Sequence, residues 1–590
     1  MCGIVGYIGG KKATPILLES IKKLEYRGYD SVGMCTIGEN LDILKGVGRI
    51  HEVHDKINFH SLEGNLGISH TRWATHGSVT DFNAHPHVSN NKKIAVIHNG
   101  IVENYQELKK MLEQNGFTFY SETDTETIPN LIEFEMRKGK DFEHAAMDAM
   151  KQLEGYYAIL AIFEGEGKIV ASRNGSPLVI GVGEDENFIA SDIPAFLEHT
   201  KKVMYIHDND FIVLDKDGKI RFHNLETGKQ VKRPVHSIDW SAEQAEKGNF
   251  DHFMMKEISE QVDTVKKAAN QDKATLFEVA EAVKKAKGVF FVACGSSYHA
   301  CLSVSYIFSK VAKMHVNVVL GSEFSNYEHF LTPDSLVIAV SQSGETIDVL
   351  DAVRTAKKKG SKVMSIVNVM GSSLHRSSDK SLMLHAGPEI CVLSTKTYTA
   401  QLAVLSLLAY TVAGKYEEGK KNLEYVWNTI YNLTSASTRK YIKKLAERLK
   451  DKDHIFTIGR GLQFPTSLEA ALKIKEVSYI HAEGFSGGEL KHGTIALIEQ
   501  DIPCIVFASE ENEKEIISNA MEIKARGGYI IGVSPSNNEV FDFFIKTPDV
   551  GNLNPITQII PMQILAYQLA LLRGCDPDKP RNLAKSVTVK

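Results

Sequence analysis

The second half of the chain repeats one order of strand, loop and helix, and this repeat limits the folds that the chain can adopt. GVFFVACGSSYHA and SLVIAVSQSGETIDVLDAVRTAKKKG each run from an apolar stretch through a Gly- and Ser-rich turn into a helical pattern. HIFTIGRGLQFPTSLEAALKIKE and IPCIVFASEENEKEIISNAMEIKARGG follow the same order further on, at similar spacing. Apolar strands that alternate with long helices indicate parallel sheets. We therefore expect two doubly wound α/β units, at residues 251–430 and 431–575.

Residues 1–238 have a different pattern, in which short apolar runs are joined by Gly and Asp turns. Stretches such as KKIAVIHNG, GYYAILAIFEG and DFIVLDKDGKIRFH favour antiparallel pairing, and helical segments such as YQELKKMLEQNG interrupt them. Residues 239–250 are polar and charged and are predicted to form a linker. Residues 576–590 contain few apolar side chains and are predicted to form a C-terminal tail. The chain is thus expected to combine an α+β domain with two α/β units.

Charge, cysteine content and hydropathy argue against several classes of protein. The formal net charge is −5 and no long basic block is present, so nucleic acid is not expected as the main partner. The seven cysteines are odd in number and lack CxxC spacing, which indicates neither a disulfide framework nor a zinc site. No apolar run approaches the ~18 residues of a membrane helix. We therefore expect no membrane partner, and a cytoplasmic location is the default expectation.

Cys2 is the first candidate for chemistry. If the initiator methionine is removed, Cys2 carries a free α-amine close to its own thiol, and that amine can serve as the base that activates the thiol. Gly3 leaves room for a substrate to approach. Taken alone, however, Cys2 is more simply explained as a small residue at the start of a chain.

Other segments offer the remaining groups that acyl transfer needs. An apolar strand ends at Asn99-Gly100, where an amide side chain and a backbone N–H could stabilise an oxyanion. Asn-Gly is also a strong turn signal. Arg72 and Asp124 offer a cation and an anion for the carboxylate and the amine of an amino acid, although an exposed Arg or Asp is usually just solvated.

Two loops in the first α/β unit suit a phosphate group. Hydroxyls, glycine and free N–H groups gather where a strand turns into a helix, at Ser296, Ser297, Ser341, Gln342, Ser343 and Thr346. Such groups at a helix N-terminus favour a phosphate dianion, and two such loops favour a ligand at the ends of parallel strands. Ser and Gly are also common caps and turn residues. Neither GxxxxGK[ST] nor GxGxxG after a strand occurs, so the sequence does not indicate a nucleotide site.

Several titratable residues lie near the end of the chain. Lys473 and Glu476 are three residues apart on one face of a predicted helix, a spacing that ordinary surface ion pairs share. His492 precedes a glycine, and Lys585 lies in the predicted tail. Without further context, each of these side chains is more simply explained by a structural role or by exposure to solvent than by a role in catalysis.

In order along the chain, the motifs resemble a known family. CGIVGYIG, LEYRGYDSVG, HTRWATHG, NAHPHVS, HNGIVENY and SETDTE resemble the glutaminase domain of N-terminal-nucleophile amidotransferases. CGSSYHA, SQSGET, EICVLSTKTYTAQ, ALKIKEVSYIHAEGFSGGELKHG and PRNLAKSVTV resemble the two sugar-isomerase (SIS) units and the tail of the glutamine–fructose-6-phosphate aminotransferases. The resemblance implies an αββα glutaminase sandwich, residues 1–238, followed by two doubly wound SIS units.

For the glutaminase half, the resemblance implies that Cys2 attacks the side-chain amide of L-glutamine and releases ammonia. Asn99 and Gly100 would form the oxyanion hole. The residues that it assigns to the glutamine pocket are Arg72, Trp73, Thr75, His76 and Asp124. Trp73 would also gate a passage through which ammonia reaches the second half.

For the isomerase half, the resemblance implies that Lys585 forms a Schiff base with C2 of open-chain fructose 6-phosphate. Glu476 would move a proton between C1 and C2 with Lys473 assisting, and His492 would assist ring opening from the other subunit of a homodimer. The residues assigned to the sugar and its phosphate are Ser296, Ser297, Ser341, Gln342, Ser343, Thr346, Val392 and Ala584. The products would be glucosamine 6-phosphate and glutamate, in the first step of hexosamine synthesis, and no metal or other cofactor is expected.

Two alternatives stay open at this point. The same glutaminase could serve another phosphosugar acceptor, or the SIS units could act as a sugar-phosphate sensor without turnover. The chain also departs from the family pattern at Ser296, where many relatives carry Thr, and at Lys590, where relatives commonly carry an acidic residue.

Overall fold

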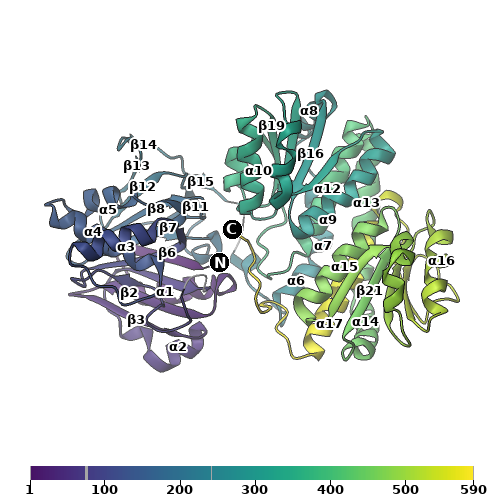
Figure 1. Ribbon diagram of the computed structural model, residues 1–590, viewed down its shortest axis with the longest axis horizontal. Coiled ribbons are helices and arrows are strands. Elements are labelled where there is room, and N and C mark those ends of the chain that lie inside the picture. The colour runs from purple at the N-terminus through teal and green to yellow at the C-terminus, as the bar shows by residue number, and fades with distance from the viewer. Residues whose placement is uncertain (1, 74–76, 239, 241, 589–590) are drawn as a thin grey trace. The chain divides into compact units, whose positions relative to one another are not determined.

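A computed structural model gives the structure of the protein (Figure 1). It describes residues 2–73, 77–238, 240 and 242–588. The chain forms two compact units. The first consists of Met1–Ala245 together with Ala584–Lys590, and the second is Glu246–Leu583. The finer domain boundaries given above remain predictions.

The first unit contains two antiparallel sheets. One has the order β15 (His236–Ser237), β11 (Lys202–Tyr205), β9 (Val179–Val182), β10 (Glu186–Ala190), β1 (Gly3–Gly9), β4 (Leu66–Arg72), β2 (Ser31–Ile37), β3 (Leu41–Val47). The other has the order β14 (Gln230–Val231), β13 (Ile220–Asn224), β12 (Asp210–Asp215), β8 (Lys168–Asn174), β7 (Gly155–Phe163), β6 (Ile94–Val102), β5 (His87–Val88). The antiparallel pairing expected from the Gly- and Asp-rich turns is confirmed.

Helices cover the outer faces of these sheets. They are α1 (Ala13–Lys22), α2 (Ile50–Ile57), α3 (Tyr105–Gln114), α4 (Thr127–Arg137) and α5 (Phe142–Met150). Successive strand side chains point to opposite faces, and β6 shows the consequence. Ile94 and Val96 join the core beneath α4 and α5, whereas Ala95 and Ile97 join the core between the two sheets. The expected αββα sandwich is thereby confirmed (Figure 1).

The second unit contains two parallel sheets with the same strand order. One is β17 (Asn317–Leu320), β16 (Gly288–Ala293), β18 (Ser335–Ser341), β19 (Lys362–Val367), β20 (Lys380–Met383). The other is β22 (His481–Ser486), β21 (His454–Gly459), β23 (Pro503–Phe507), β24 (Tyr529–Ser534), β25 (Phe543–Lys546). In each sheet the first strand in sequence lies between the second and the third. This common order confirms the internal repeat and places a topological switch point between β16 and β18 and another between β21 and β23.

The helices of the second unit pack around both sheets and between them. They are α6 (Phe253–Ser259), α7 (Gln261–Ala268), α8 (Lys273–Lys285), α9 (Gly295–Ile307), α10 (Ile347–Lys358), α11 (Ser373–Ser377), α12 (Lys396–Val412), α13 (Tyr416–Leu433), α14 (Ala436–Leu449), α15 (Gln463–Ser478), α16 (Glu513–Lys524) and α17 (Asn554–Leu572). One hydrophobic core runs through the unit and includes Met254, Ile338, Ile474 and Ile560. The two α/β parts therefore share a core, in which α9 packs against both α12 and α15.

Against the expectation that no apolar run approaches the length of a membrane helix, one helical stretch among the described residues, Gly551–Leu572, is long and apolar enough to cross a membrane by length and composition. Most of this stretch, which includes α17, is buried inside the second unit against α14 and α15. The core helix of a large domain passes the same test, so the stretch is weak evidence for a membrane span.

Candidate active sites

Cys2 immediately precedes β1, in the middle of its sheet. Gly3 pairs with Thr71, so Cys2 lies beside the end of β4, and the backbone N–H of Trp73 donates a hydrogen bond to Cys2 Sγ at 3.2 Å. Burial raises the pKa of the Cys2 thiol, and the Trp73 N–H opposes part of that shift because it favours the thiolate. The thiol is therefore positioned for attack but depends on a base.

Asn99 is held between Cys2 and a buried histidine. Its Nδ2 donates to the carbonyl oxygen of Cys2 at 2.9 Å, and its Oδ1 lies 3.0 Å from His70 Nε2. The same nitrogen of His70 lies 3.1 Å from the carbonyl oxygen of His98. Both partners of this nitrogen are acceptors, so His70 carries its proton on Nε2 and turns the amide NH₂ of Asn99 towards Cys2. Burial, the main cause, lowers the pKa of His70 to about 3, so the imidazole is neutral at ordinary pH.

Gly100 occupies a position on β6 that only glycine fits. Its φ is +116°, and a Cβ at this position would lie 1.9 Å from the carbonyl oxygen of Tyr156. Asn99-Gly100 lies inside the β6–β7 pairing, with Asn99 opposite Ala158 and Gly100 opposite Tyr157, and β6 continues to Val102. The prediction that the strand ends at Asn99-Gly100 is therefore wrong, and so is the alternative of a turn there. The close approach of β7 explains why a side chain is excluded there.

Arg72 and Asp124 are both buried, which removes the interpretation of two simply solvated charges. Arg72 ends β4 and donates to the carbonyl oxygens of Gly77 and Ser78 at 3.3 and 3.2 Å. Asp124 begins a short 3₁₀ helix (Asp124–Glu126), and its Oδ2 accepts from the N–H of Val102 at 2.8 Å. Trp73 is half-buried, with its ring 5.8 Å from that of Tyr29. Thr75 and His76 lie outside the described residues.

A buried arginine beside Cys2, Arg27, was not predicted from the sequence. Arg27 donates from Nε to the carbonyl oxygen of Cys2 at 3.3 Å and from Nη1 to Asp192 at 3.0 Å. The hydroxyl of Tyr26 donates to the same oxygen of Asp192 at 2.7 Å. The motif LEYRGYDSVG carried the only signal, whereas the partner Asp192 lies 165 residues further on.

The two Ser-rich loops of the second unit lie side by side at the β16–β18 switch point. Ser341 ends β18, and its hydroxyl lies 2.9 Å from that of Thr346 and accepts from the N–H of Gly344 at 3.1 Å. Thr346 is the N-cap of α10. Ser296 and Ser297 lie in the first turn of α9, directly after the neighbouring strand β16. Hydroxyl and N–H groups from both loops thus face the edge where open α/β sheets bind ligands.

A buried ionic network joins α15 to this edge. Lys473 is fully buried, and its Nζ lies 2.8 Å from Glu476, 3.3 Å from Glu469 and 3.0 Å from the hydroxyl of Ser296. The predicted alternative of an ordinary surface ion pair is therefore wrong. Burial favours the neutral amine, but Glu469 and Glu476 outweigh it and raise the pKa of Lys473, so the side chain is a fixed ammonium.

Sequence reasoning also missed Glu469 and His299. Glu469 is fully buried, accepts from Ser296 Oγ at 2.8 Å, and has its other oxygen 2.8 Å from His299 Nδ1. Burial opposes ionisation, yet Lys473 and His299 lower the pKa of Glu469. The i, i+4 spacing of Glu469 and Lys473 was the available signal, but it does not distinguish a buried pair from an exposed one.

The remaining predicted residues lie elsewhere. Val392 is half-buried in the loop before α12, and His492 is exposed at the end of a short 3₁₀ helix (Gly487–His492), outside the Lys473 network. Ala584 and Lys585 group with the first unit. The positions of the two units relative to one another are not determined, so the roles of Ala584 and Lys585 remain predictions.

Comparison with known proteins agrees with both halves. A glutamine amidotransferase domain model matches residues 70–198, and a SIS domain model matches residues 282–411 and 448–573. Fold and matches together define a glutamine amidotransferase domain joined to two SIS domains. Relatives named glutamine–fructose-6-phosphate aminotransferase [isomerizing] align over the full length of both chains, at 47% identity in Thermococcus kodakarensis and 45% in Methanothermobacter thermautotrophicus. The chain belongs to this aminotransferase family.

Solved structures agree for the second unit. The C-terminal domain of glucosamine-fructose-6-phosphate aminotransferase from Francisella tularensis is 33% identical, with a TM-score of 0.52 over 56% of this chain and 99% of that chain. Tagatose-6-phosphate ketose/aldose isomerase from Escherichia coli, at 16% identity, has a TM-score of 0.50 over 57% of this chain and 96% of that chain, and shares the fold.

Proposed function

We propose that the chain converts L-glutamine and D-fructose 6-phosphate into L-glutamate and D-glucosamine 6-phosphate, the first step of hexosamine synthesis, through two sites that exchange ammonia. One observation carries the proposal. A single chain of this family holds a thiol beside an amide donor, and also a buried Lys–Glu network beside two hydroxyl-rich loops. The first arrangement suits amide hydrolysis, and the second suits proton movement on a phosphorylated sugar.

In the glutaminase half, Arg72 binds the α-carboxylate of glutamine and Asp124 binds its α-amine. Once Met1 has been removed, the α-amine of Cys2 takes the thiol proton, and Sγ adds to the side-chain amide carbon. Asn99 Nδ2 and the N–H of Gly100 donate to the oxyanion, with His70 keeping the Asn99 amide in the correct orientation. The C–N bond then breaks, the proton passes to the leaving ammonia, and water hydrolyses the remaining thioester to glutamate.

In the isomerase half, the Ser- and Thr-rich loops hold the phosphate, and the amine of Lys585 adds to C2 of the open-chain sugar with loss of water. Ammonia then replaces Lys585 at C2, and Glu476 takes a proton from C1 and returns it to C2. Lys473 assists as a fixed cation rather than as the imine-forming amine, because its ammonium is paired with Glu469 and Glu476.

The direct test is to incubate the purified protein with glutamine and fructose 6-phosphate and to identify the product. Glucosamine 6-phosphate is expected. A sugar phosphate that binds without product would support a sensor, and a product that forms only with a different sugar phosphate would support another acceptor. Cys2→Ala should lose activity with glutamine but keep it with ammonium salt, whereas Lys585→Ala should lose activity with both nitrogen sources.

We further propose a homodimer in which each His492 serves the partner's sugar site, because His492 is exposed in this chain. Co-expression of differently tagged His492→Ala and Lys585→Ala chains tests this. A purified hybrid dimer would regain about half of the wild-type activity, since one of two symmetric sites is complete. A hybrid as inactive as its parents would contradict the arrangement. A cytoplasmic location without membrane or nucleic-acid partners also remains our expectation.

A further inference from the structure

The loop between β20 and α12 lies at the sugar site and has no regular secondary structure. We refer to residues 386–395 as the sugar loop. It carries Val392, and the carbonyl oxygen of Ser394 accepts a hydrogen bond from Lys473 Nζ at 3.3 Å. Most of the loop is buried. Backbone N–H groups that are buried outside helices and sheets need other partners, or the loop cannot hold one conformation.

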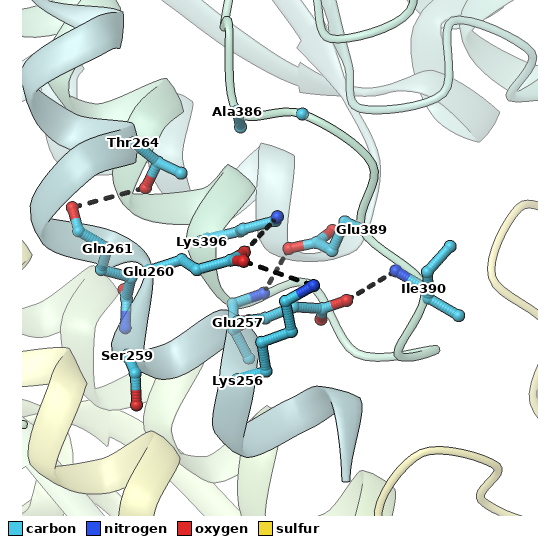
Figure 2. A network of polar contacts seen from close by, with 12 residues as sticks. Lys256, Glu257, Ser259, Glu260, Gln261, Thr264, Ala386, Glu389, Ile390 and Lys396 are labelled. Atoms are coloured by element: carbon cyan, nitrogen blue, oxygen red, sulfur yellow. Dashed lines mark hydrogen bonds and ion pairs between the residues drawn. The ribbon is translucent and has the colours of Figure 1, made fainter. Parts of the chain in front are cut away.

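Two buried carboxylates supply those partners (Figure 2). Glu257, on α6 and 1% exposed, accepts from the N–H groups of Ile390 and Cys391 at 2.6 and 3.1 Å. Glu389, within the loop, accepts from the N–H groups of Thr395 and Thr397 at 3.0 and 3.1 Å. Both ends of the segment that carries Val392 and Ser394 are therefore fixed by charge-assisted hydrogen bonds, which are stronger than neutral ones.

Glu389 also caps α12. Thr395 is the N-cap of that helix, and the N–H groups of a first helical turn have no partner within the helix. Glu389 binds two of them and also accepts from the hydroxyl of Thr397 at 2.7 Å. A carboxylate at this position is further stabilised by the helix dipole. The end of the sugar loop is thus held by the start of a long buried helix.

A buried lysine also bonds the start of α12 to Glu260, the residue between α6 and α7. Lys396, at the first position of α12 and 2% exposed, donates to Glu260 Oε2 at 2.6 Å, as Figure 2 shows. Lys256 lies 3.6 Å from the other oxygen of Glu260 and donates to the backbone carbonyl of Glu246. The sugar loop is therefore bonded to α6 through Glu257, and α12 is bonded through Lys396 to Glu260, between α6 and α7.

We propose that Glu257 and Glu389 are positioning residues for the sugar reaction. They hold the sugar loop in the conformation that presents Val392 and fixes Lys473 through Ser394 before the sugar binds. This inference rests on the proposed function, because it takes the loop as part of the fructose 6-phosphate site. Without the carboxylates, part of the binding energy of the sugar would be used to order the loop. The protein would then bind fructose 6-phosphate more weakly and would hold it less precisely for reaction.

The test compares Glu257→Ala, Glu257→Gln and Glu389→Gln with Asp263→Asn, which removes an exposed carboxylate from α7. We expect Glu257→Ala to raise KM for fructose 6-phosphate and to lower kcat/KM for glucosamine 6-phosphate formation by about tenfold to a hundredfold. Glutamine hydrolysis without sugar, a reaction of the first unit, should persist. Glu257→Gln should retain more activity, because its amide oxygen can still accept both N–H groups. Asp263→Asn should match the wild type.

Two further measurements keep the inference falsifiable. Titration of fructose 6-phosphate by calorimetry reports binding without turnover, so weaker binding by Glu257→Ala would support the inference even if the wild type formed a different product. If the alanine variant fails to fold, hydrogen exchange of the two Gln variants tests the inference instead. We expect the backbone amides of residues 390–397 to exchange faster in these variants than in the wild type. Unchanged sugar binding together with unchanged exchange would overturn the inference, as would an equal loss of glutamine hydrolysis and sugar conversion.

Discussion

His70 provides the sharpest test of the glutaminase site, because its protonation state follows from its contacts. The imidazole is buried and neutral, with Nε2 donating towards Asn99 and the carbonyl oxygen of His98. Burial lowers its pKa to about 3 in the folded protein, against about 6.5 in an unfolded chain. Between these two values the unfolded state binds one more proton than the folded state. The stabilising contribution is therefore complete above about pH 6.5 and is lost as the pH falls towards 3.

The size of the effect follows from these two pKa values. Lowering the pH from 7 to 5 should cost the first unit about 2 kcal/mol of unfolding free energy through His70 alone. His85 and His87 also have pKa values well below the usual range because they are buried, so they add to the pH dependence of the wild type. His70→Gln keeps an N–H donor for Asn99 but cannot titrate. The difference between the two proteins therefore isolates His70.

The assay is urea unfolding of the full chain at pH 7 and pH 5. Pulse proteolysis at each urea concentration measures the fraction of the first unit that is still folded. We expect the pH-dependent loss of unfolding free energy to be about 2 kcal/mol smaller in His70→Gln than in the wild type. His51→Gln, which changes an exposed histidine on α2, should behave as the wild type. An identical pH dependence in the wild type and His70→Gln would refute the assignment of a neutral, buried His70.

Three further substitutions, one of them with a matched control, test other parts of the sites. Gly100→Ala should lower the unfolding free energy of the first unit by about 3 kcal/mol or more, because the new Cβ would meet the carbonyl oxygen of Tyr156. The control Gly116→Ala, at φ +84° in open space, should lower it by about 1 kcal/mol. The urea concentrations at the unfolding midpoints of the two variants and the wild type measure this difference. Arg27→Met should slow glutamine hydrolysis about tenfold, because Arg27 donates a hydrogen bond to Cys2 in the first unit. Binding of fructose 6-phosphate, measured by calorimetry, should stay unchanged, because the proposed phosphate loops belong to the second unit. Glu469→Ala should destabilise the second unit by about 3–5 kcal/mol and lower sugar conversion, because it removes one carboxylate partner of the buried Lys473. Full stability of Glu469→Ala would contradict the buried charge pair.

The sequence predicts the fold well where a pattern is local. Alternating apolar strands and helices predicted the two parallel sheets, and the turns into α9 and α10 predicted the two loops at the β16–β18 switch point. Contacts between residues far apart in sequence could not be predicted in this way. Glu257 binds the N–H of Ile390 across 133 residues, and the proton position on His70 depends on how β4 and β6 face one another. Lys473 illustrates the same limit, since its spacing to Glu476 is equally suited to a surface pair.

The transfer of nitrogen between the two sites is tested most directly with glutamine that carries ¹⁵N in its side-chain amide. The full chain is incubated with this glutamine, fructose 6-phosphate and an excess of unlabelled ammonium salt, and the product is examined by mass spectrometry. We expect glucosamine 6-phosphate in which almost all of the amine carries the label, because in the proposed mechanism ammonia passes from the Cys2 site to the sugar without mixing with solvent. A product that carries the isotope ratio of the bulk ammonium, or the absence of glucosamine 6-phosphate, would contradict the account.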